Sequence, residues 1–178
     1  GQQLLNVRED HTGYGDLFWW IDPSIEAERP VATDVGRTFS DIGLSVWRSG
    51  WSPEATILLH HCGMKGQHKE ENMNHVTLYA RGQRILPDAV GTRTIDHNVP
   101  VVDGTKQNKW MAGETTAYHS DPTCGYSSGR FGHYFGFRRQ VLFLRDDLVV
   151  LVDDLTLGDR QREVEFRLHP NGDTSVTD

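Results

Sequence analysis

The sequence predicts an all-β fold: an antiparallel β-sandwich, of the supersandwich or jelly-roll kind, with an irregular N-terminal arm. Short apolar runs recur at intervals of roughly ten residues and are bounded by Gly, Ser, Pro, Asn or Asp, which is typical of strands joined by turns. No stretch keeps a helical period beyond a turn or two. Eighteen glycines in 178 residues also favour a fold rich in turns.

The N-terminal arm is predicted over residues 1–36 and the sandwich over residues 37–178. The arm includes "GYGDLFWWIDPSIEAERPVATD", which has aromatic, Gly and Pro residues but no sustained period. The first strands of the sandwich are predicted in "IGLSVWRS" and "EATILLHHC". In "HVTLYARG" apolar and polar residues alternate, and a turn at 81–83 leads into "RILPD". This alternation predicts a hairpin.

The C-terminal part continues the β pattern. "QVLFLRDDLVVLVDDL" consists of two apolar runs joined at Asp146 and Asp147, which predicts a second hairpin. "REVEFRLHP" alternates apolar with polar residues and predicts another strand. The final "HPNGDTSVTD" is polar and lacks a closing strand, so we expect the sandwich to be truncated at its C-terminus.

Composition and charge narrow the classes of function. The formal net charge of −7 argues against a general nucleic-acid or anionic-membrane binder, because the overall field repels such partners. No apolar run approaches the ~20 residues of a membrane span. The opening "GQQLLNVRED" shows no signal-peptide pattern. Two cysteines, Cys62 and Cys124, allow either one disulfide or two free thiols.

The stretch "GQHKEENMNH" and the residues after it are rich in potential metal ligands. The hairpin over 75–88 brings residues near its two ends together, so Glu70 is expected close to Asp88. His97 follows nine residues after Asp88 and can return to the same edge. Imidazole and carboxylate suit zinc or manganese. The sequence therefore predicts a metal site of Glu70, Asp88 and His97, with His75 on the polar face of its strand.

Three other groups are interpreted as structural. Cys62 ends an apolar strand and is expected in the core. Asp153 and Asp154 end another strand, and we expect a solvated acidic pair there rather than a calcium site. "GYSSGRFGHYFGFRR" is expected to be a twisted strand with its loop, in which Arg139 packs by its stem. Binding of sugar acids by this segment is the alternative.

A cupin-like metal enzyme is an alternative to these interpretations. His68, Glu70, His75 and Gly82 follow the spacing of the first cupin motif with His and Glu exchanged. The second cupin motif is not matched.

Five blocks in order carry a resemblance that covers most of the chain. They are "LFWWIDP", "FSDIGLSVWRSGW", "HKEENMNHVTLYARGQRILPDAVG", "DHNVPVVDGTKQ" and "FRRQVLFLRDDLVVLVDDL". Together they resemble the C-terminal β-sandwich domain of the heparinase II/III-like family. Those proteins are polysaccharide lyases and relatives that act on uronic-acid polymers such as heparan sulfate and alginate.

The resemblance implies roles for individual residues. His68 matches a histidine of the catalytic cleft, and Arg93 and Asn98 are the expected substrate-binding residues. Asp88 and His97 match two zinc ligands, and Glu70 stands where a third ligand, a histidine, is expected. The site departs from the family pattern there and at 72, where an asparagine replaces an aspartate. The interval from Asp88 to His97 is also shorter than in the family.

The resemblance also implies how such a domain works. Lyases of this family remove a proton beside a uronate carboxylate and expel the neighbouring sugar, and several of the groups needed lie on a helical toroid that precedes the sandwich. This chain contains no such toroid, so we expect it to be inactive alone and to act with a preceding helical domain on an anionic polysaccharide. A periplasmic or secreted location follows from the same resemblance. A non-catalytic carbohydrate-binding or structural sandwich is the other alternative.

Overall fold

The computed structural model describes residues 35–63, 70–88, 91–132, 135–145 and 148–171. The predicted arm therefore lies outside the described residues, except for Val35 and Gly36, and strand β1 already begins at Gly36. Contacts group residues 33–178 into one compact unit. Within the described residues, no helix is long and apolar enough to cross a membrane.

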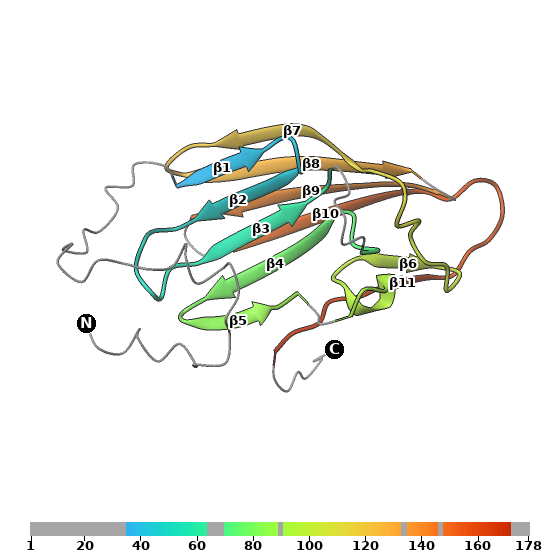
Figure 1. Cartoon of the computed structure of the whole chain (residues 1–178), viewed down its shortest axis with the longest axis horizontal. Coiled ribbons are helices and arrows are strands. Elements are labelled where there is room, and N and C mark those ends of the chain that lie inside the picture. Colours follow the sequence, from blue (N-terminus) through green and yellow to red (C-terminus); the bar gives the residue numbers. More distant parts are fainter. Residues whose placement is uncertain (1–34, 64–69, 89–90, 133–134, 146–147, 172–178) are drawn as a thin grey trace, which may run out of the picture. The chain divides into compact units, whose positions relative to one another are not determined.

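Two antiparallel sheets make up most of the unit (Figure 1). The first sheet follows chain order as a meander, and the second runs in the order β10-β9-β8-β7. The strands of the first sheet are β1 (Gly36–Phe39), β2 (Leu44–Arg48), β3 (Ile57–His61), β4 (His75–Ala80) and β5 (Gln83–Leu86). Those of the second are β7 (Glu114–Ser120), β8 (Cys124–Gly132), β9 (Gly136–Leu144) and β10 (Leu148–Thr156).

The chain between Leu86 and Glu114 connects the two sheets. It contains the 3₁₀ helix η2 (Thr94–Asp96) and strand β6 (Pro100–Val102). Strand β6 pairs antiparallel with β11 (Val164–Phe166), so the end of the described chain returns beside this connection (Figure 1).

The main apolar core lies between the two sheets. Trp47 and Leu58 from the first sheet pack with Val141 and Phe143 from the second, and all four side chains are buried. Tyr118 from β7 stacks on Trp47 with ring centroids 5.6 Å apart. Burial of one face of each sheet against the other defines a sandwich, which confirms the all-β prediction.

The predicted hairpins are confirmed. Strand β4 pairs with β5, and the turn between them places Arg81 at φ 54° and Gly82 at φ 71°. Two successive positive φ values fit the right-handed twist of a two-residue hairpin turn, where glycine is favoured. Strand β9 pairs with β10 over its whole length. The strand predicted in "REVEFRLHP" is shorter than expected, and it covers only Val164–Phe166.

Polar side chains also fill part of the interior. Buried His60 is hydrogen-bonded through Nδ1 to Ser127 Oγ at 2.6 Å and through Nε2 to Asn74 Oδ1 at 3.1 Å. Burial lowers the pKa of His60 to about 3, with a smaller contribution from the charge of Arg139. His60 is therefore neutral at physiological pH.

Asp153 and Asp154 were expected to end their strand as a solvated pair, but they lie within β10, which continues to Thr156, and only Asp154 is well exposed. Asp153 accepts two hydrogen bonds from Arg139, each at 2.7 Å, and the two side chains are 9% and 3% exposed. Arg139 also donates to the main-chain oxygens of Asn74 and Asn98. Alternation along β9 turns Arg139 into the sandwich, so its charged head is buried together with the stem that was expected to pack.

Candidate metal centre

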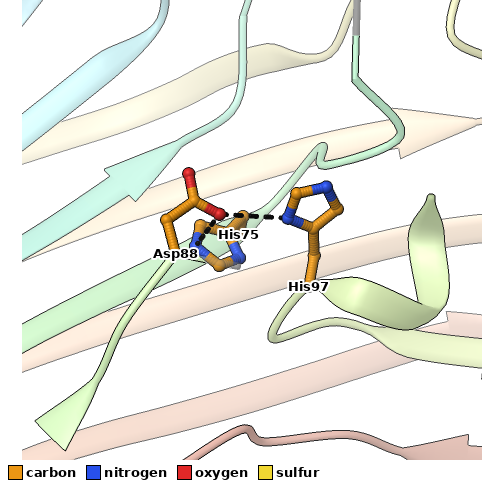
Figure 2. Close-up of side chains that lie close together, drawn as sticks. All are labelled: His75, Asp88 and His97. Carbon is orange, nitrogen blue, oxygen red and sulfur yellow. Dashed lines mark hydrogen bonds and ion pairs between the residues drawn. The ribbon is translucent and has the colours of Figure 1, made fainter. Parts of the chain in front are cut away.

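Three potential ligands meet where β4 begins (Figure 2). Leu78 of β4 pairs with Leu86 of β5, so Asp88, two residues beyond, lies opposite the start of β4. His75 is the first residue of β4, and His97 follows η2 directly. The carboxylate of Asp88 lies between the two rings, with Oδ1 3.2 Å from His75 Nε2 and 3.1 Å from His97 Nδ1.

The two histidines are buried, and the carboxylate faces solvent. The rings of His75 and His97 meet edge to face with centroids 5.2 Å apart. Asp88 is 48% exposed, so an ion could enter from its side. Burial lowers the pKa of His75 to about 4 and outweighs the opposing effect of the Asp88 carboxylate. His75 is therefore neutral at physiological pH, which is the form that binds metal.

The donor set fits zinc by type and spacing. Two imidazoles and a carboxylate are a common set of three protein ligands for zinc. Zinc–ligand distances of about 2.0–2.1 Å in a tetrahedral site place neighbouring ligand atoms roughly 3.3 Å apart. The separations of 3.1 and 3.2 Å found here are close to that value.

Hydrogen bonding sets a condition on ligation by His75. The Asn98 N–H donates to His75 Nδ1 at 3.0 Å, so the neutral ring carries its proton on Nε2. That Nε2–H faces Asp88 and Thr77. Ligation through Nε2 would move that proton to Nδ1 and break the contact with Asn98. The lost contact would leave the buried Asn98 N–H without its acceptor, which costs about 1–3 kcal/mol, less than the ~10–16 kcal/mol of apparent binding energy at structural zinc sites. Zinc binding can therefore offset the loss.

Ligation by His97 requires less rearrangement of hydrogen bonds than ligation by His75. Its Nδ1 faces Asp88, and its buried Nε2 has no hydrogen-bond partner within the described part of the chain. Transfer of the ring proton from Nδ1 to Nε2 therefore breaks no second contact. Asp88 and His97 can bind an ion with less rearrangement than His75.

Several solved structures have a fold similar to that of this chain. A heparinase III structure matches with a TM-score of 0.72 and 20% identity, over 82% of this chain and 25% of that chain. Heparan sulfate lyase HepC from Pedobacter heparinus matches with a TM-score of 0.62 and 19% identity, over 68% of this chain and 22% of that chain. The chain has a heparinase III-like fold. It spans about a quarter of the length of these structures.

The heparinase III-like fold confirms the resemblance noted in the sequence at the level of architecture. Another heparinase III structure matches with a TM-score of 0.57 and 18% identity, over 68% of this chain. No protein-family model matches the sequence, and no curated protein matches it. The similarity to solved structures therefore concerns the fold of the sandwich.

In this heparinase III-like sandwich, the predicted ligands are only partly brought together. Asp88 and His97 meet as predicted from the hairpin, but Glu70 belongs to neither ligand cluster among the described residues. Glu70 instead accepts a hydrogen bond from Asn72 at 2.8 Å. The third potential ligand is His75, which was expected on a polar strand face. His68, the predicted catalytic residue, lies outside the described residues.

The two predicted substrate-binding residues have different environments. Asn98 is buried, and its amide donates to the main-chain oxygens of Val76 and Pro87 and accepts from His169 N–H. In this arrangement the Asn98 side chain links β4, the segment after β5 and the segment after β11, and it does not face solvent. Arg93 is 68% exposed and donates to both carboxylate oxygens of Asp96.

Arg93 lines an open groove of about 540 Å³. Lys106 and Thr105 lie on the same groove, together with Glu71 and Thr94. Two cationic side chains on one groove suit a carboxylate or sulfate, although Glu71 and Asp96, which already pairs with Arg93, add opposing charges. Sequence reasoning did not single out Lys106.

The sequence carried a signal for His75 that was not used. Alternation placed His75 on the same strand face as Thr77 and Tyr79. The hairpin register puts the residue two beyond β5 opposite the start of β4. Counting this register from the turn at 81–82 would have paired Asp88 with the beginning of β4.

Proposed function

We propose that this chain is the β-sandwich domain of a polysaccharide lyase that cleaves a uronic-acid-containing polysaccharide, of heparan sulfate or alginate type, by β-elimination. The match to heparinase III over 82% of the chain is the observation that carries the proposal. The similar fold of HepC, a heparan sulfate lyase, supports the same class of substrate. The proposed location is periplasmic or secreted.

The reaction defines what side chains near the substrate must do. A base removes the proton next to the uronate carboxylate, and negative charge develops on that carboxylate before the 4-linked sugar leaves. Hydrogen-bond donors or cations facing the carboxylate stabilise this charge, and a base within hydrogen-bond reach handles the proton. We assign carboxylate binding to Arg93, with help from Lys106, and catalysis to His68.

A zinc or manganese ion is proposed at His75, Asp88 and His97. Such an ion would supply a positive centre that fixes these three side chains. The neutral state of His75 and the solvent-facing carboxylate of Asp88 support its entry. Fixing Asp88 and His97 would in turn hold the segment between them, which includes Arg93.

Catalysis is proposed to need further residues from a second domain. The chain spans only 22–26% of the length of the heparinase structures it matches. We propose that a helical domain supplies the opposite wall of the cleft. Without such a domain, the chain would act as a carbohydrate-binding or structural sandwich.

The test measures cleavage of heparan sulfate and alginate by the full natural protein that contains this chain. The unsaturated uronate product is followed by its ultraviolet absorbance. Arg93→Gln is expected to lower kcat/KM at least tenfold, because a charged hydrogen-bond donor contributes roughly 1.5–3 kcal/mol. Arg138→Gln, which removes another exposed arginine, serves as the matched control.

Elemental analysis of the same samples tests the ion. We expect Asp88→Ala to lower the zinc or manganese content by about one ion per chain, and Asp154→Ala, an acid of similar exposure, to leave it unchanged. A full protein that cleaves neither polymer would contradict the lyase proposal. A metal content that Asp88→Ala does not lower would contradict the ligand assignment alone.

A further inference from the structure

A second cluster of metal-binding side chains lies at the turn between β7 and β8, in "HSDPTC". Ser120 pairs with Gly125, and Asp121 N–H donates to Cys124 O at 2.9 Å, so Asp121 and Cys124 face each other across the turn. His119 and Asp121 are two residues apart, and alternation places them on one face. The imidazole, carboxylate and thiol consequently meet, with ligand atoms all within 4.8 Å of one another.

The turn holds the carboxylate of Asp121 in a defined orientation. Its Oδ1 accepts three hydrogen bonds: from Thr123 N–H at 2.7 Å, from Thr123 Oγ1 at 2.6 Å and from Cys124 N–H at 2.8 Å. Its Oδ2 lies 2.8 Å from His119 Nε2 and 3.7 Å from Cys124 Sγ. Oδ1 is thus engaged by two backbone N–H groups and the Thr123 hydroxyl, and Oδ2 faces His119 and Cys124.

The carboxylate is ionised over the physiological range. The hydrogen bond from the Thr123 hydroxyl, followed by that from His119, holds the pKa of Asp121 well below its usual value. The charge available to a cation at this turn is therefore present before the cation arrives.

We propose that His119, Asp121 and Cys124 form a metal site that binds a divalent cation of the zinc class. A nitrogen, an oxygen and a sulfur ligand suit a borderline ion such as zinc and do not suit calcium or magnesium. His119 is 57% exposed, so the ion reaches the site from solvent. Three protein ligands leave a fourth position for water.

Binding requires deprotonation of the thiol. The Cys124 Sγ–H proton is released to solvent as the sulfur–metal bond forms, so affinity rises with pH. The neighbouring cation is Arg145, which donates to the main-chain oxygen of Asp121 and to Ser120 Oγ. Ser120 lies between His119 and Asp121 in sequence, so its side chain and Arg145 are on the other face. Arg145 fixes the turn through these hydrogen bonds, and its charge also interacts with Asp121 and Cys124.

The other cysteine does not offer the same chemistry. Cys62 is buried, and its thiol donates weakly to the main-chain oxygens of Glu114 and Arg130. Burial raises the pKa of Cys62 to about 12, so its thiolate is scarce at neutral pH. Both cysteines are free, which leaves Cys124 as the accessible thiol.

Titration with cobalt(II) tests the site, because thiolate ligation produces a sulfur-to-cobalt charge-transfer band. The whole chain is used with Asp88→Ala, which removes the first metal centre. We expect one equivalent of cobalt to produce the band in this background. The band is expected to disappear in Cys124→Ser and to persist in Cys62→Ala.

His119→Gln provides a second variant, because this exposed side chain can be replaced without disturbing the core. We expect its cobalt affinity to fall at least tenfold, and zinc to displace the cobalt from the unsubstituted site. A band that survives Cys124→Ser, or no band at millimolar cobalt in a folded chain, would overturn the proposal. The result does not depend on lyase activity, so the two proposals can fail separately.

Discussion

Breaking the buried ion pair between Arg139 and Asp153 should destabilise the sandwich severely. The side chains are 3% and 9% exposed, and Asp153 supplies both of the anionic contacts of Arg139. In Asp153→Asn the charge is removed, and the amide group of asparagine would face the guanidinium donors. The main-chain oxygens of Asn74 and Asn98 would remain as the neutral partners of a buried cation.

The expected loss follows from the burial of the pair. Removal of one partner of a buried ion pair costs about 3–5 kcal/mol, because the other charge is left uncompensated. Domains have total stabilities of about 5–15 kcal/mol, so this change removes a large fraction. At about 2–4 °C per kcal/mol for a chain of this size, Tm should fall by roughly 6–20 °C.

The adjacent pair on the same two strands is the control. Arg138 and Asp154 also form a two-bonded contact, at 2.9 and 2.6 Å, but they are 52% and 50% exposed. Exposed pairs contribute about 0.2–1 kcal/mol, so Asp154→Asn should lower Tm by no more than about 4 °C. Because salt screens exposed charges more than buried ones, high salt should reduce only this smaller effect.

Urea unfolding followed by circular dichroism measures both variants under identical conditions. Linear extrapolation then converts the midpoint shift into a free energy. If Asp153→Asn lost no more stability than Asp154→Asn, the reasoning from burial would be refuted, and the Arg139 pair would have to be hydrated.

Two further variants test the packing of the interior. His60 binds its proton in the unfolded state near pH 6.5 but in the folded state only near pH 3, so stability should fall by ~1.4 kcal/mol per unit as pH drops through this window. In urea unfolding from pH 7 to 4, His60→Gln should lower the slope by this amount and leave the part that His75 contributes through its own lowered pKa; an unchanged slope would contradict the assignment. In Gly125→Ala the new Cβ would lie 2.3 Å from the buried Trp47 ring, so the free energy of unfolding should fall by about 1–3 kcal/mol. Gly132→Ala, on the same strand with no atom within 4 Å of its Cβ, should change stability little, and equal losses would refute the clash.

The parts of the fold that follow from local pattern were predictable. The hairpin of β4 and β5 shows clean alternation, and its turn contains Gly82 at a positive φ. The same local reasoning brought Asp88 and His97 together, because the two residues flank one short connection at one sheet edge. Strand β7 was not predicted, because "ETTAYHS" is largely polar and its apolar residues do not alternate regularly.

Contacts between the two sheets could not be read from the sequence. Asp153 and Asp154 are identical residues in adjacent positions, yet one is buried in an ion pair and the other is half exposed. His75 was expected on a polar face, but the connection through Asn98 covers that end of the strand. The environment of each residue depends on a segment far away in the chain.

The sequence by itself determined most of the strands, the hairpins and the edge that carries Asp88 and His97, because alternation and turn chemistry act between near neighbours. Only the tertiary structure decided that His75 replaces Glu70 beside Asp88 and that Arg139 is buried against Asp153. It also showed that the turn after His119 brings three potential ligands together. Alternation determines which residues share a face of a strand, but burial and charge pairing depend on what the folded chain packs against that face.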